Sequence, residues 1–114
     1  MEAEALKGHL DGLLLAVLAE GPAHGYAVIA RLRQRSQARF DLPEGTVYPA
    51  LHRLEAAGLL VSDWDSQTGR RRRVYRLTGR GEGALGARRS EWRKFAGAVE
   101  AVLGRDGAAA VDPA

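Results

Sequence analysis

Apolar residues recur at helical spacing in the first third of the chain. From about Ala3 to Glu20, leucine and valine fall at i, i+4, i+7 and i+8, which predicts an amphipathic helix that ends at Gly21-Pro22. Its apolar stripe consists of Leu6, Leu10, Leu13, Leu14, Val17 and Leu18. A second helix is predicted from about Gly25 to Ser36, with Tyr26, Ile29 and Leu32 on one face.

Residues 41–60 predict a third, capped helix that ends in a turn. Asp41 and Glu44 have the spacing of a capping box, and Pro43 suits a first helical turn, where its missing N–H is harmless. Gly58 supplies the stop. We therefore expect this helix to run from about Leu42 to Ala57.

The third helix has an inward apolar stripe and an unusual outward face. Val47, Leu51 and Leu54 recur at i, i+4 and i+7 and point inward. A proline within a helix costs about 3 kcal/mol, so Pro49 needs a reason. The face looks suited to touching a partner, and the alternative is a kinked core helix with incidental polar residues. The residues left on other faces are Thr46, Tyr48, Pro49, His52, Arg53 and Ala56.

Two short segments after the third helix predict a β-hairpin. Leu60–Asp65 and Arg72–Leu77 favour strands, and residues 66–69 have the composition of a turn. Three helices followed by such a hairpin make a winged helix-turn-helix, a mainly α fold with a small β-hairpin. In this arrangement the third helix enters a major groove of duplex DNA and the hairpin, or wing, reaches an adjacent groove or the backbone.

A last helix is predicted from Thr78, as N-cap, to about Leu103. Its apolar stripe is spaced like a helix-pairing seam, and a small domain cannot bury so long a stripe alone. We expect dimerisation with the same helix of a second copy; the alternative is packing on the first helix of the same chain. The expected interface residues are Leu85, Trp92, Phe95, Val99 and Val102. The predicted division is a winged-helix domain at 1–78, a dimerisation helix at 79–104 and a disordered tail at 105–114.

Composition excludes several classes of function. With 114 residues the chain forms one domain, and it has no cysteine for disulfides or thiolate metal sites. Its three histidines lie on separate predicted elements, so we expect neither a metal, a cofactor nor an enzyme. Residues 81–86 match G-x-G-x-x-G, but no second parallel strand follows, which argues against a dinucleotide site. No signal peptide or membrane span is apparent, and we expect a cytoplasmic protein.

The cations of the chain are mostly arginines, fifteen against two lysines, and they gather near the wing. No acidic residue lies between Asp65 and Glu82. Arginine forms forked hydrogen bonds with phosphate or guanine, so the patch suits a polyanion, although charge runs are often merely solvated. The patch comprises Arg70, Arg71, Arg72, Arg73, Arg76 and Arg80.

Each tryptophan has two interpretations. Trp64, in the first strand of the hairpin, is interpreted as a packed wing residue rather than a platform for base stacking. Trp92 is interpreted first as a dimer-core residue, and the alternative is a ligand-stacking role in a cavity between two copies.

Several stretches resemble the PadR family of bacterial transcriptional regulators over about residues 6–104. The most specific is G-T-x-Y-P-x-L-x-R-L-E-x-x-G-L at 45–59, supported by H-G-Y at 24–26; LLLAVLAEGPAHGYAVIARL, RRVYRLT and EWRKFAGAVEAVL also contribute. The resemblance implies a homodimeric winged-helix protein, similar to the short subfamily, that binds a palindromic promoter site. It also implies a repressor that a small aromatic or drug-like effector releases.

The resemblance assigns the DNA-reading helix to Pro43 through Ala57. The residues expected to face the groove or backbone are Thr46, Tyr48, Pro49, His52 and Arg53, together with the wing arginines Arg70, Arg71, Arg72 and Arg73. Many relatives carry Gly-Gly-Pro in the hairpin, where this chain has Thr68-Gly69 and four arginines. Two rival functions remain open: a winged-helix module that binds a protein without specific DNA binding, and a dimer that sequesters a ligand at Trp92.

Overall fold

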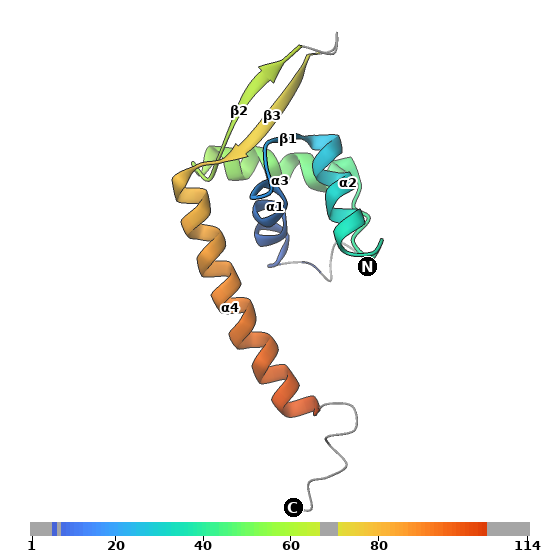
Figure 1. The fold of residues 1–114 in the computed structure, drawn as a ribbon, viewed down its shortest axis with the longest axis vertical. Coiled ribbons are helices and arrows are strands. Elements are labelled where there is room, and N and C mark those ends of the chain that lie inside the picture. The colour runs from blue at the N-terminus through green and yellow to red at the C-terminus, as the bar shows by residue number, and fades with distance from the viewer. Residues whose placement is uncertain (1–5, 7, 67–70, 105–114) are drawn as a thin grey trace, which may run out of the picture.

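The computed structural model describes residues 6, 8–66 and 71–104, and the tail expected at 105–114 lies outside them. Three helices form the body, a hairpin projects from it, and a long last helix leads away from it (Figure 1). The elements in chain order are α1 (Leu10–Leu18), β1 (Ala23–His24), α2 (Gly25–Arg35), α3 (Glu44–Ala56), β2 (Leu60–Asp65), β3 (Arg72–Leu77) and α4 (Gly79–Leu103).

The core lies where α1, α2 and α3 meet the base of the hairpin. Each helix contributes aliphatic side chains at helical spacing, such as Leu14, Val28 and Leu51, all fully buried. Tyr75 of β3 closes this core, and burial raises the pKa of its hydroxyl. The predicted inward stripe of the third helix, Val47, Leu51 and Leu54, is confirmed.

The first two helices differ from the predictions in detail. The first begins at Leu10 instead of Ala3, because Gly8 takes a left-handed conformation with φ of 89° that ends regular helix. α2 has the predicted bounds to within a residue, but the predicted inward position of Tyr26 is wrong. Tyr26 is 56% exposed, and Val28 and Leu32 fill the buried face at i and i+4.

The capping box predicted for the third helix does not form. Pro43 occupies the N-cap and therefore no side chain caps the helix, while Asp41 lies one turn earlier and forms an ion pair with Arg33 at 3.5 Å. The amide of Thr46 donates to the Pro43 carbonyl at 3.0 Å and closes the first turn. α3 therefore begins two residues later than predicted and ends one residue earlier.

The predicted hairpin is confirmed at both of its strands. β2 and β3 pair antiparallel from Leu60 opposite Leu77 to Asp65 opposite Arg72. A third strand, β1, pairs with the other edge of β3 and gives the sheet order β1-β3-β2. The sequence did not reveal β1, because two residues are too few to set up an alternating pattern.

The last helix begins as predicted and is anchored only at its start. The Thr78 hydroxyl accepts a bond from the amide of Gly81 and donates to the Gly58 carbonyl at 2.7 Å, which ties the cap to the end of α3. Gly81 and Leu85 are the buried residues of α4. Beyond them the helix leaves the body (Figure 1). Among the described residues, no helix combines the length and apolarity that a membrane crossing requires.

Candidate nucleic-acid interface

The outward face of α3 is small and polar at its centre. Because Val47, Ala50, Leu51 and Leu54 point into the core, the opposite side of the helix is exposed. Gly45, Pro49, His52 and Ala56 follow one another along this exposed side. Small residues allow a helix to approach a partner closely, and the imidazole of His52 supplies a polar group at the middle of the face.

Tyr48 occupies the flank of this face that adjoins α2. Its ring lies against Gly25, at the first position of α2, and a Cβ at Gly25 would be 2.4 Å from the phenol oxygen. Burial, followed by the nearby Glu44 carboxylate, raises the pKa of Tyr48. The Gly-Tyr part of the H-G-Y motif is thus explained, since Gly25 makes room for Tyr48 and Tyr26 donates to Glu44 at 3.2 Å.

Arg53 occupies the opposite flank and is held by α1. Its guanidinium donates to the carboxylate of Asp11 at 2.8 Å, and this hydrogen bond raises the pKa of Arg53. Arg88 of α4 approaches the same Asp11 oxygen at 3.7 Å and donates to the Gly8 carbonyl. Asp11, which the sequence analysis did not single out, therefore links the reading helix to α4.

The wing carries an aromatic and cationic cluster on the face that continues from the core. Side chains alternate along β2 and β3, so Trp64, Arg73 and Arg71 lie on the side of the buried Tyr75. The guanidinium carbons of Arg71 and Arg73 are 4.5 and 4.8 Å from the centre of the Trp64 ring. We call these three residues the wing cluster.

Glu55 joins the wing cluster to α3. The Ser62 hydroxyl donates to the Glu55 carboxylate at 2.7 Å and accepts a bond from Arg73 Nε at 2.9 Å. A second guanidinium nitrogen of Arg73 is 3.9 Å from the same carboxylate. The outward face of α3 and the wing cluster are therefore parts of one continuous surface.

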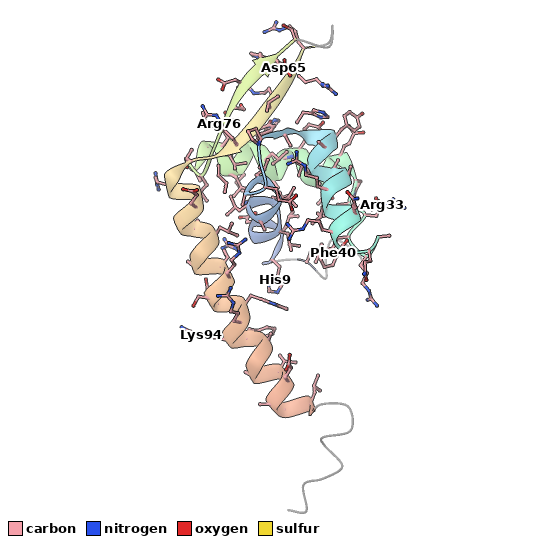
Figure 2. All side chains as sticks on the ribbon, viewed as in Figure 1. His9, Arg33, Phe40, Asp65, Arg76 and Lys94 are labelled. Carbon is pink, nitrogen blue, oxygen red and sulfur yellow. The ribbon has the colours of Figure 1, made fainter. Side chains whose placement is uncertain are left out.

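The other face of the wing is partly neutralised. Arg76, at the base of the hairpin, pairs with Asp63 at 3.7 Å (Figure 2). His24 of β1 is the N-cap of α2, where its Nδ1 accepts a bond from the Ala27 amide at 3.3 Å. Burial and then the charge of Arg72 lower the pKa of His24, so the neutral form that this cap requires is favoured. Arg70 lies outside the described residues.

The second half of α4 presents apolar side chains to solvent. Phe95 is 57% exposed and Val102 is 86% exposed, and both line a shallow apolar surface with Ala98, Val99 and Leu103. Leu85, expected at the dimer interface, is instead buried in the core of its own chain, where it anchors α4. The alternative of packing on α1 thus describes the first half of α4 but not the second.

Trp92 and Phe95 form an aromatic group with His9. The rings of His9 and Trp92 meet edge to face at 5.3 Å between centroids, and Phe95 lies 5.9 Å from Trp92. His9 precedes α1 and reaches the distal half of α4, a contact across 83 residues that no local pattern announces. In the part of the chain that the structure describes, no group of histidine and acidic side chains could hold a metal ion.

A sequence profile of the transcriptional regulator PadR-like family matches residues 14–87. Among individual proteins, the chain is 46% identical over 67 residues to transcriptional regulator Rv3488 of Mycobacterium tuberculosis, a match that covers 59% of this chain and 60% of that protein. An uncharacterised protein of Lysinibacillus sphaericus is 28% identical over 93 residues, covering 81% of this chain and 85% of that one.

Solved structures of the same family share the fold. A PadR family transcriptional regulator from Eggerthella lenta has a TM-score of 0.77 and 34% identity, with 88% of this chain and 86% of that chain covered. A transcriptional regulator from Clostridium thermocellum has a TM-score of 0.82 and 26% identity, covering 90% of this chain and all of that one. The similarity extends beyond the profile, because both matches cover most of this chain.

Proposed function

The chain belongs to the PadR-like family of transcriptional regulators, a family of non-enzymatic proteins, and we propose that it is a sequence-specific DNA-binding repressor. In this proposal it acts as a homodimer on a palindromic promoter site and a small aromatic effector releases it. A regulator of this kind works beside the chromosome, so its expected compartment is the cytoplasm.

One observation carries the proposal: the outward face of α3 and the wing cluster form a single surface joined through Glu55. A helix with a narrow, small-residue ridge fits the major groove, whose width admits one α-helix. The wing then lies beside the groove, where its guanidiniums meet phosphates. A solvated core helix has no need for such a union of helix and arginines.

The proposed contacts divide between bases and backbone. His52, at the middle of the outward face, and Arg53, at its edge, are proposed to reach base edges. Arg53 would exchange its bond with Asp11 for one with DNA. Contacts with sugar and phosphate are proposed for the remaining residues, which are Thr46, Tyr48, Pro49, Arg70, Arg71, Arg72 and Arg73.

Dimerisation is proposed through the distal half of α4. The exposed stripe of Trp92, Phe95, Val99 and Val102 has no cover within the described chain, and a second copy offers a matching stripe. Two reading helices would then address half-sites about one helical turn of DNA, roughly 34 Å, apart. A palindromic site follows from the twofold symmetry of such a dimer.

Release by an effector is proposed at the aromatic group on α4. Trp92 is 52% exposed, and its ring lies beside His9 and Phe95, so a flat aromatic molecule could stack there between two copies. Quenching of tryptophan fluorescence by aromatic compounds, lost on Trp92→Leu and retained on Trp64→Leu, is the expected result. Equal quenching in both variants would contradict a site at Trp92.

Selection of bound fragments from random duplex DNA tests the central proposal. We expect a symmetric consensus, because two identical reading helices contact two half-sites. Changing Arg71 and Arg72 together to alanine should weaken binding to every sequence and flatten its salt dependence. Weak, sequence-blind binding by a folded dimer would overturn the proposal. The surviving alternative would be a protein-interaction module, recognised by a partner complex that persists in high salt.

A further inference from the structure

We propose that Trp64 is a positioning residue of the wing: its indole holds Arg71 ready for a phosphate of the DNA backbone. Arg73, on the same ring, has a different task in this scheme, since it fastens the wing to α3. The inference deepens the proposed function and rests on the wing's contact with nucleic acid.

Trp64 is placed where an apolar residue has nothing to bury against. Its side chain is 55% exposed, and it lies on β2 opposite Arg73, two residues beyond Ser62 on the same face. The core ends at Tyr75, so the indole stands beyond it. A packed wing residue was expected here, and the described side chains that the ring contacts are two guanidiniums.

The two arginines of the wing cluster differ in how their charges are compensated. Arg73 donates to Ser62 and lies 3.9 Å from the Glu55 carboxylate, so its charge is matched within the protein. Within the described residues Arg71 forms no ion pair, and it is exposed. An arginine with an uncompensated charge is the one that gains most from a phosphate.

An indole holds a guanidinium in a way that leaves it able to bind. A carboxylate would neutralise the charge of Arg71 and occupy its N–H groups. The face of a tryptophan ring attracts the cation through its quadrupole and takes none of the five N–H donors. Trp64 therefore restricts the long side chain of Arg71 before DNA arrives, and the ordering cost of binding is reduced.

Binding of the selected operator, measured over a range of salt concentrations with the full chain, tests the inference. Trp64→Leu should weaken binding about two- to fivefold, the range that an exposed cation–π contact supports, with the salt slope unchanged because every charge remains. Trp64→Phe keeps an aromatic face and should lose less. Arg71→Ala should weaken binding further and reduce the slope by about 0.9, corresponding to one phosphate.

Arg73→Ala is the matched control on the same ring. It should lower thermal stability, since it removes the bridge to Glu55, and should change the salt slope less than Arg71→Ala does. Wild-type affinity in Trp64→Leu would overturn the inference, as would equal losses in Trp64→Leu and Trp64→Phe. If the wild type binds DNA without sequence preference, the proposed function fails. The positioning of Arg71 is still decided, because a phosphate contact requires no sequence.

Discussion

The outward face of α3 and the distal face of α4 are both uncovered in the single chain, yet their chemistry differs. On α3 the exposed ridge consists of small residues and His52, with cations at its edges. On α4 it consists of Phe95, Val99 and Val102, with aromatic neighbours. One helix thus offers donors to a polyanion, and the other offers apolar area to a second copy.

The difference shows why exposure alone does not define a binding site. Apolar area is removed from water by any matching apolar surface, so the α4 stripe supplies affinity with little choice of partner beyond shape. Hydrogen-bond donors on a narrow ridge discriminate, because an unmatched donor in a groove costs free energy. We therefore assign pairing to α4 and sequence choice to α3.

The largest expected effect comes from placing charge on the α4 stripe. Phe95→Asp together with Val99→Asp should abolish the dimer, because buried carboxylates would face one another. Loss of the second reading helix should weaken operator binding by about 10²- to 10⁴-fold. Sedimentation velocity and operator titration measure the two effects. Ala101→Asp adds a carboxylate away from the stripe and should remain dimeric; a dimeric double variant would contradict the assignment.

The next effect concerns the joint between the two regions. A Cβ at Gly81 would lie 2.1 Å from the backbone oxygen of Leu59, whereas at Gly83 it would meet nothing within 4 Å. Gly81→Ala should therefore destabilise the protein by about 1–3 kcal/mol through overpacking. Gly83→Ala should stabilise it by up to about 1 kcal/mol through helix propensity. Thermal melting compares them, and equal shifts would mean that α4 is not held at Gly81.

A smaller effect tests how the reading face works. Arg53→Ala should cost about 1–3 kcal/mol on the preferred operator alone, if the guanidinium leaves Asp11 to read a base. An equal loss on random DNA would reassign Arg53 to the backbone. Asp11→Asn should have a smaller influence on binding in the Arg53→Ala background than in the wild type, if Asp11 acts through Arg53.

The smallest effect is a dependence of stability on pH that belongs to the body and to neither face. His24 accepts a bond only when neutral, and its pKa is lowered from the ordinary value of 6.5. Its contribution is therefore complete above about pH 6.5 and is lost as the pH falls through the folded-state pKa. Melting temperatures at pH 8 and pH 5 measure the loss. His24→Asn retains a capping oxygen and should remove this part of the dependence.

Local patterns predicted most of the fold. The hairpin strands, the Thr78 cap and the inward stripe of α3 follow from alternation, capping chemistry and helical spacing, all of which act within a few residues. The capping box failed because Pro43 took the cap position and Asp41 paired with Arg33. Tyr26 was misplaced because a single aromatic residue at helical spacing does not fix which face is buried.

The candidate site was predictable only as a set of separate residues. Arg53 and the wing arginines were evident from composition, but their partners Asp11, Glu55 and Ser62 were not. Asp11 meets Arg53 across 42 residues and Arg88 across 77, and contacts at such separations depend on how the helices pack. The division of the wing cluster into one compensated and one uncompensated arginine likewise required the structure.

The close packing at Gly81 makes α4 a lever with a very short inner arm. At about 1.5 Å per residue, its 25 residues extend roughly 37 Å. A tilt of about 10° at the inner end would displace the outer end by roughly 6 Å, about twice the length of a hydrogen bond. In a dimer joined at the outer ends, the separation of the two α3 helices would thus be governed by the few atoms around Gly81 and Leu59.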